Sequence, residues 1–326
     1  MAKETKTILY SVIVLLCCAV FILCLLMIQM KNEAVETMSE NQDADLRTIT
    51  YKGEKYYPKQ GQKLILYMGV DQPGIFDSER RQENVQPTSI MVIAIHEPEE
   101  TFSVLQLNRN TQAEILMSDQ NISSREETAP GPMATAYTYG KDIKDQCLNM
   151  SETVSHYLTG IEMDNYVVFG TDAIKIANDM VGGSRVLIRD DFSSTAPELV
   201  QGKEMTLLGN QVLEYLKTLP QEDAVGREGA LRRQKEVFEC FTKNLNSKTQ
   251  QDNGFPVDLF QSITEYMHTD CSDDRLASIL ASVSDYEFKE TITLGGTKQE
   301  IDGQEVYVVD EDRLMEICIR LFYEKK

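Results

Sequence analysis

The longest uncharged run of the chain lies close to its N-terminus. It covers residues 7–28, TILYSVIVLLCCAVFILCLLMI. In a helix, about 22 residues at a rise of roughly 1.5 Å each span a bilayer core of about 30 Å. A cleavable signal peptide is the alternative, but its apolar region is normally only about 7–15 residues long and is followed by small residues at a cleavage site. This run ends in IQMKNE, so we predict an uncleaved transmembrane helix.

The residues that flank this run predict its orientation. Lys3 and Lys6 lie before it in the short segment 1–6, whereas Lys31 after it is soon followed by acidic residues. Because positive charges favour the cytoplasmic side, we expect residues 1–6 in the cytoplasm and the rest of the chain outside the cell. Residues 29–60 are polar and are predicted to form a stalk between the membrane and a folded domain.

Beyond the stalk, strand patterns alternate with helix patterns. Near-continuous apolar runs at 63–70, 89–96 and 101–107 are typical of strands buried on both faces. Shorter β-prone runs predict further strands at 165–170, 184–188, 286–294 and 305–309.

Helical spacing of apolar residues fills the intervals between these strands. It predicts helices at 151–160 with a Ser151 cap, 171–183 with a Thr171 cap, 209–219, 231–248, 256–268, 274–283 and 310–325. The alternation predicts one α/β layered domain, with helices on both faces of a mixed sheet.

Charge and cysteine content exclude some functions. The chain has 32 basic and 52 acidic residues, a net charge of −20, which argues against a nucleic-acid partner. Three of its seven cysteines lie in the predicted transmembrane helix. The other four are scattered without the spacing of a zinc site, and their disulfide state is left open: Cys147, Cys240, Cys271 and Cys318.

The stretch LQLNRNTQAEI contains the first candidate for chemistry. The apolar run 101–107 ends in Asn108, Arg109 and Asn110. In α/β proteins, strand ends and the loops after them carry most binding and catalytic residues. A solvated turn is the alternative interpretation.

Several motifs, in their order along the chain, resemble one known family. They are LILYMGVD, QPTSIMVIAI, VLQLNRNT, ATAYTYG, IEMDNYVVF, DMVGGSRVLI and LRRQ. The sequence resembles the LytR-CpsA-Psr family over residues 61–245, and residues 246–326 match more loosely, as a C-terminal α/β extension packed on the same domain.

The resemblance implies both a fold and a function. The implied fold is an α/β/α sandwich whose apolar groove holds a lipid tail. The implied activity is extracytoplasmic transfer of a glycopolymer from a polyprenyl-pyrophosphate carrier to peptidoglycan in a Gram-positive-type envelope, with arginines and Mg²⁺ at the pyrophosphate.

The same resemblance assigns roles to residues of this chain. Arg109 and Asp71 match catalytic positions, and Asp71 is also the candidate metal ligand. A planar guanidinium suits two phosphate oxygens and keeps its charge at neutral pH. The predicted pyrophosphate ligands are Arg109, Arg233, Gln234, Lys217 and Arg232, the last of which has no firm counterpart in the family, with Asn108, Asn110 and Thr88 in supporting positions.

The chain also departs from the family pattern. Thr88 and Asn110 stand where the family has aspartates, and Ala230 stands where it has an arginine, three residues before Arg233. Because Mg²⁺ prefers anionic oxygen ligands, these changes should weaken its binding. We therefore expect either a transferase with fewer charges at its centre or a protein of the same fold that binds a polyprenyl-linked glycan without transferring it.

Overall fold

The computed structural model describes residues 48–325, except 75, 78–79, 118–127 and 302. The predicted segment 1–6, the transmembrane helix 7–28 and the first part of the stalk lie outside the described residues. Within the described part of the chain, no helix combines the length and apolarity that crossing a membrane requires. The end of the predicted stalk forms an antiparallel hairpin of β1 (Ile49–Tyr51) and β2 (Glu54–Pro58).

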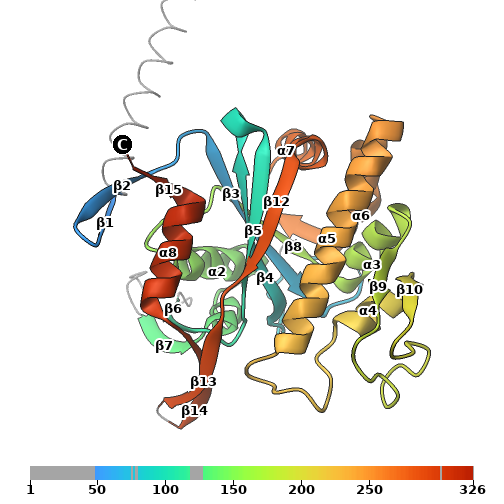
Figure 1. Ribbon diagram of the computed structural model, residues 1–326, viewed down its shortest axis with the longest axis horizontal. Helices are drawn as coiled ribbons and strands as arrows, with labels where there is room; N and C mark the ends of the chain where they lie inside the picture. The colour runs from blue at the N-terminus through green and yellow to red at the C-terminus, as the bar shows by residue number, and fades with distance from the viewer. Residues whose placement is uncertain (1–47, 75, 78–79, 118–127, 302, 326) are drawn as a thin grey trace, which may run out of the picture. The chain divides into compact units, whose positions relative to one another are not determined.

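Residues 59–324 form a compact unit of their own, built on a six-stranded sheet (Figure 1). The strand order is β11-β8-β3-β4-β5-β12. β3 pairs in parallel with β8 and antiparallel with β4, so the predicted mixed sheet is confirmed. The strands are β3 (Gln62–Val70), β4 (Pro87–His96), β5 (Thr101–Leu107), β8 (Asn165–Phe169), β11 (Met267–Thr269) and β12 (Glu287–Thr293).

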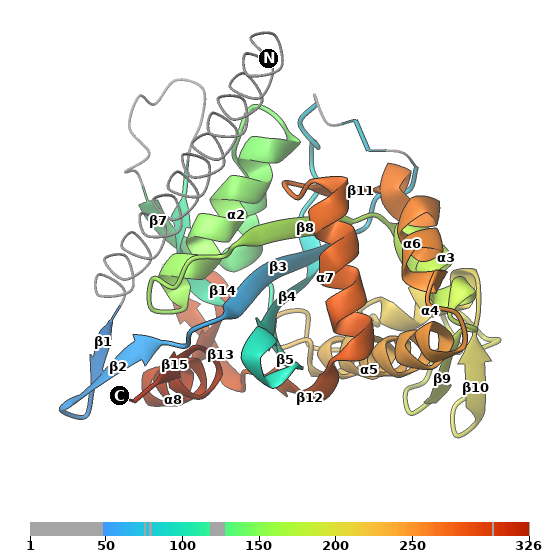
Figure 2. The ribbon, with the colours of Figure 1, turned by 90° about the horizontal axis from the view of Figure 1, so that it is seen from above.

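Helices cover both faces of this sheet (Figure 2). One face packs against α3 (Thr171–Met180), α5 (Glu228–Gln251), α6 (Phe255–Ile263) and α7 (Asp273–Asp285), through a core of alternate strand side chains such as Ile65, Met91, Val104 and Val167. α2 (Ile143–Tyr157) covers the opposite face. Because successive side chains of a strand point to opposite faces, strands between two helical layers are apolar throughout.

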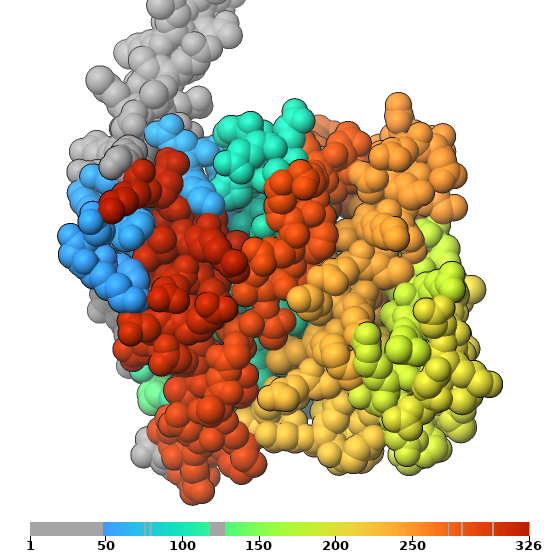
Figure 3. Space-filling model, in the orientation of Figure 1, coloured from blue at the N-terminus to red at the C-terminus, as the bar shows by residue number. Residues whose placement is uncertain are grey.

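The remaining elements belong neither to the six-stranded sheet nor to the helices named above. They are the hairpins β6 (Gln112–Leu116) with β7 (Thr128–Pro132), β9 (Ser184–Leu187) with β10 (Glu204–Leu207) and β13 (Gly296–Ile301) with β14 (Gln304–Val309), and α4 (Asn210–Leu216), α8 (Glu311–Phe322), β15 (Tyr323–Glu324), η1 (Glu97–Glu99), η2 (Met133–Thr138) and η3 (Thr264–Tyr266). Elements from α5 to the C-terminus make up most of the face of this unit seen in Figure 3.

Two predicted helix caps were wrong. α2 begins eight residues before the predicted start, because the Asp142 carboxylate accepts a hydrogen bond from the Asp145 N–H at 2.9 Å and caps it there. Ser151 therefore lies inside the helix. Thr171 is the first residue of α3, and Gly170 before it provides no side-chain cap.

The C-terminal part of the chain belongs to the central sheet. The expected boundary at 245 falls inside α5, and β11 and β12, which form the two edges of the sheet, both follow it. Residues 246–324 are therefore an integral part of the fold, and α3 before the boundary and α7 after it help enclose the same core.

Candidate functional site

Two cavities of different character meet at the ends of β3 and β4. The apolar cavity, of about 220 Å³, lies between the sheet and α3, α5, α6 and α7 and is lined by side chains such as Tyr67, Met91, Phe169 and Phe238. The polar cavity, of about 610 Å³, lies beyond the strand ends. Both are lined by Thr88, Ile174 and Leu216, so the two spaces adjoin.

The polar cavity brings together five of the residues predicted from the sequence. Four come from strand ends or the loops beside them, as the sequence suggested, and the fifth is the C-cap of α4. They are Asp71, Thr88, Arg109, Asn110 and Lys217, and Glu214 and Arg227 join them.

Arg109 reaches the polar cavity from the end of β5. Its guanidinium donates a hydrogen bond to Gln86 Oε1, and its buried Nε has no hydrogen-bond partner among the described residues. Burial lowers the pKa of the Arg109 guanidinium. Since no carboxylate pairs with Arg109 in the described part of the chain, the structure leaves a half-buried positive charge available to an anion.

Arg227 lines the polar cavity and was not predicted from the sequence. It is only 6% exposed and precedes α5 with a left-handed φ of 51°. Its Nε donates to Thr218 Oγ1 at 2.9 Å and its Nη1 to the Thr88 carbonyl at 3.1 Å. Burial, and then the charge of Arg109, lowers the Arg227 pKa to about 10.

The signal for Arg227 was the pair Gly226-Arg227 just before a helix. Counting back from Arg233 instead placed the family arginine at Ala230, which is a buried residue of α5. Arg227, six positions before Arg233, lines the polar cavity.

Asn108 and Asn110 hold the loop that carries Arg227. The Asn108 amide donates to the carbonyls of Val225 and Gly226 at 2.9 and 2.8 Å. The Asn110 amide donates to those of Ala224 and Val225 at 2.9 and 3.1 Å. An aspartate could not donate these bonds. The supporting role of both asparagines at a phosphate site stays a prediction.

Asn110→Asp is expected to loosen this loop. The substitution removes two hydrogen bonds and places a carboxylate against two carbonyl oxygens, at a cost of about 1–3 kcal/mol. Backbone amides of residues 218–227 should exchange hydrogen about ten times faster. Gln221→Glu is the control, because its amide donates to the Asp191 carbonyl at an exposed position where water can replace it. Unchanged exchange in Asn110→Asp would contradict a clamping role.

The carboxylates of the polar cavity differ in their partners. Glu214 pairs with Lys217, whose Nζ lies 2.6 Å from Glu214 Oε1. Asp71 is exposed at the end of β3 and has no hydrogen bond or ion pair among the described residues. The Thr88 hydroxyl donates to the Gly69 carbonyl at 3.2 Å. Asp71 is therefore the described carboxylate most available to a ligand.

This donor set does not fit the magnesium ion that the family resemblance implies. Mg²⁺ takes about six oxygen ligands, usually several waters together with one or two carboxylates and the phosphates of a substrate. In the described part of the chain, no three histidine, cysteine, aspartate or glutamate side chains are grouped to hold a metal. Thr88 and Asn110 use their side chains on backbone carbonyls, which leaves Asp71 alone. Its role as a metal ligand stays a prediction.

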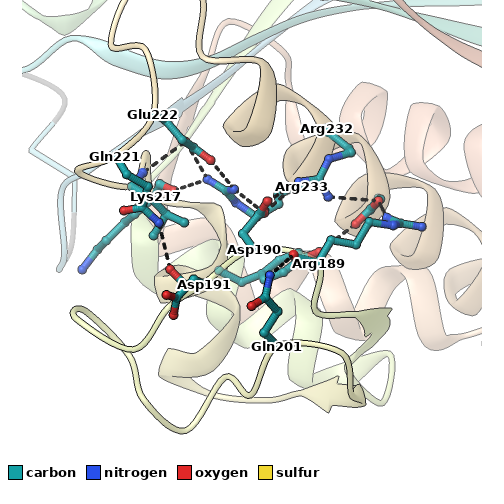
Figure 4. Close-up of polar contacts among 12 residues, drawn as sticks. Arg189, Asp190, Asp191, Gln201, Lys217, Gln221, Glu222, Arg232 and Arg233 are labelled. Carbon is teal, nitrogen blue, oxygen red and sulfur yellow. Dashed lines mark hydrogen bonds and ion pairs between the residues drawn. The ribbon is translucent and has the colours of Figure 1, made fainter.

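Arg232, Arg233 and Gln234 do not line the polar cavity. Arg233 is fully buried and its Nη1 lies 2.6 Å from both Asp190 Oδ2 and Glu222 Oε1 (Figure 4). Arg232 pairs with Asp190 at 2.7 Å. Burial disfavours the ionised Asp190, but hydrogen bonds from Arg233 and Arg232 outweigh it and lower the carboxyl pKa.

Gln234 lies elsewhere than Arg232 and Arg233, at the wall of the apolar cavity. It lines the apolar cavity, and its amide donates to the Thr88 carbonyl at 3.0 Å. Its Oε1 accepts from Gln106 at 3.3 Å. These three predicted ligands therefore do not line the polar cavity that Arg109 lines.

Solved structures with the same fold are distantly related in sequence. TagT bound to LI-WTA is 17% identical, with a TM-score of 0.61 over 80% of this chain and 90% of that one. TagV of B. subtilis is 18% identical, with a TM-score of 0.59 over 81% and 96%. A protein of Streptococcus agalactiae is 20% identical, with a TM-score of 0.63 over 80% and 86%. At this identity, the likeness establishes the fold.

Sequence comparison establishes the family. Among curated protein sequences, none matches this one closely enough to count as a relative. The sequence profile of the LytR_cpsA_psr family, however, matches residues 24–322, which include both cavities and all the elements around them. The chain therefore belongs to the LytR_cpsA_psr family.

Proposed function

We propose that this protein is a membrane-anchored phosphotransferase that moves a glycopolymer from a polyprenyl-pyrophosphate carrier to peptidoglycan outside the cell. Family membership supports cell-wall glycopolymer transfer in general. The observation that carries the proposal is the junction of the apolar and polar cavities at Thr88, Ile174 and Leu216. A polyprenyl pyrophosphate joins an apolar chain to a charged group in the same way.

Each cavity suits one part of this ligand. The apolar cavity excludes water from the prenyl chain, and burying its methylene groups favours binding by about 0.8 kcal/mol each. The polar cavity presents the guanidiniums of Arg109 and Arg227 to the phosphate oxygens. TagT, which shares the fold, binds LI-WTA, and this supports a glycopolymer on the far side of the phosphates.

The proposed reaction is a substitution at phosphorus. A sugar hydroxyl of peptidoglycan attacks the phosphorus that carries the glycopolymer, and the bond from this phosphorus to the bridging oxygen breaks. Polyprenyl phosphate leaves with the bridging electron pair, and the hydroxyl proton passes to a base. Asp71, exposed at the cavity, is the proposed base. Arg109 and Arg227 stabilise the charge that builds up on the oxygens.

The proposal includes the membrane anchor predicted from the sequence. Residues 7–28 would cross the membrane once, with residues 1–6 in the cytoplasm. In this proposal the polar cavity lies on the side of the membrane where peptidoglycan lies.

A second candidate function is binding of the same lipid without transfer. It is favoured by Thr88 and Asn110, whose side chains engage backbone carbonyls and offer no carboxylate to the reaction. The experiment is to incubate the full-length protein with a polyprenyl-pyrophosphate-linked glycan and peptidoglycan fragments, with Arg109→Ala as control. Release of polyprenyl phosphate that depends on Arg109 supports the transferase, whereas binding without release supports the second function.

Filling the apolar cavity should separate lipid binding from phosphate binding. Ala177 of α3 lines this cavity, and Ala177→Phe places a phenyl ring in a space of about 220 Å³. We expect affinity for geranylgeranyl pyrophosphate to fall at least tenfold and affinity for inorganic pyrophosphate to stay unchanged, both by calorimetry. The control is Ala281→Phe, at an exposed position of α7 outside both cavities. Equal losses for both ligands would indicate general disruption.

A further inference from the structure

Two guanidiniums share the polar cavity without a negative partner. Arg109 donates to the neutral Gln86 amide, and Arg227 donates to the Thr218 hydroxyl and the Thr88 carbonyl. Among the described residues, neither arginine has a carboxylate within ion-pair distance. They are also close enough that the charge of Arg109 lowers the pKa of Arg227.

Arg233 is the internal comparison for this pair. It is as deeply buried as any side chain of the unit, and two carboxylates, those of Asp190 and Glu222, compensate its charge. A buried charge without such a partner is costly unless a ligand supplies one. The polar cavity therefore has two guanidiniums that no ion pair among the described residues compensates, and their complement is an anion.

The polar cavity has few carboxylates that could attract a cation. Thr88 and Asn110 are neutral and engaged with backbone carbonyls. Glu214 is paired with Lys217, which leaves Asp71 as the unpaired described carboxylate of the cavity. A divalent cation here would have one unpaired protein carboxylate among the described residues and two nearby positive charges to repel it.

We infer that this cavity binds the phosphate groups of its ligand without a divalent cation, the guanidiniums of Arg109 and Arg227 supplying the charge that Mg²⁺ would otherwise provide. The inference rests on the proposed function for the identity of the ligand, a lipid-linked pyrophosphate. It differs from the family resemblance, which implies a magnesium ion at the pyrophosphate. Each planar guanidinium can donate two parallel hydrogen bonds, so the pair can satisfy several phosphate oxygens directly.

The test measures binding with and without metal. Full-length protein in detergent micelles is titrated with geranylgeranyl pyrophosphate and, separately, with inorganic pyrophosphate, in EDTA and in millimolar Mg²⁺. We expect dissociation constants within about twofold between the two buffers and tighter binding of the lipid. Mn²⁺, a paramagnetic substitute for Mg²⁺, should keep its free electron-resonance signal when protein and geranylgeranyl monophosphate are added together.

The outcomes separate the two proposals. Binding that weakens tenfold or more in EDTA, or a protein-dependent loss of the Mn²⁺ signal, would overturn the metal-free site and leave the proposed function standing. Inorganic pyrophosphate that binds as tightly as the lipid would overturn the lipid ligand and leave the metal-free site standing. No binding of either probe in either buffer would overturn both.

A matched pair of variants tests the cause. Thr88→Asp adds a carboxylate beside Arg227 and should create metal dependence, with at least tenfold weaker binding in EDTA that Mg²⁺ restores. Arg313→Gln removes an exposed arginine of α8 outside the cavities and should behave like the wild type. If folded Thr88→Asp protein binds geranylgeranyl pyrophosphate equally in EDTA and in Mg²⁺, the absence of a carboxylate at position 88 does not explain metal-independent binding.

Discussion

Replacing Arg227 by glutamine is expected to weaken binding of a polyprenyl pyrophosphate about 10- to 100-fold. The side chain lines the polar cavity and its charge has no carboxylate partner among the described residues. A hydrogen bond to a charged group contributes about 1.5–3 kcal/mol, and each 1.4 kcal/mol is a factor of ten. Calorimetry with geranylgeranyl pyrophosphate measures the loss.

Arg227→Lys distinguishes charge from geometry. Lysine keeps the charge but loses the planar fork and the bonds to Thr218 and Thr88. We expect it to recover only part of the affinity. The thermal midpoint of each variant serves as the control for folding. Wild-type affinity in a folded Arg227→Gln protein would show that the phosphates bind elsewhere.

Replacing Arg233 by methionine should lower the free energy of unfolding and leave ligand binding nearly unchanged. The substitution leaves the carboxylates of Asp190 and Glu222 without their shared partner (Figure 4). It also removes a guanidinium that lies 5.5 Å from the centre of the Phe192 ring. Breaking a buried ion pair from one side costs about 3–5 kcal/mol. Urea unfolding followed by circular dichroism should show this decrease, while the folded variant binds geranylgeranyl pyrophosphate within about threefold of the wild type.

The control and a pH series make this prediction specific. Arg185→Met removes an exposed pair with Glu204 and should change stability little. Because hydrogen bonds from Arg233 and Arg232 lower the Asp190 pKa, the ion pair stabilises the fold above the ordinary carboxyl pKa and is lost as the pH falls through the lowered value. The difference in stability between wild type and Arg233→Met should therefore narrow below about pH 4. A large loss of affinity with unchanged stability would instead make Arg233 a phosphate ligand.

These two arginines show where sequence reasoning succeeded and where it failed. The mixed sheet, the strands at 63–70, 89–96 and 101–107 and the helix at the LRRQ motif were predicted, because apolar periodicity is a local signal. Arg109 and Asp71 were placed correctly at strand ends. The start of α2 was missed, although Ile143, Cys147, Met150 and Val154 stand at helical spacing after the cap residue Asp142.

The amino-acid sequence by itself determined the layered α/β architecture, its family and the strand-end position of Arg109. Apolar periodicity and the order of motifs depend on residues that are close together in the sequence, so the sequence alone predicts them. Only the tertiary structure decided which arginines face the cavity. Arg233 pairs with Asp190, 43 positions away in the chain. Arg227 lines the same cavity as Arg109, and two asparagine side chains that follow β5 donate hydrogen bonds to the loop that carries it. Ion pairing between distant segments depends on how the layers pack, and no local pattern encodes it.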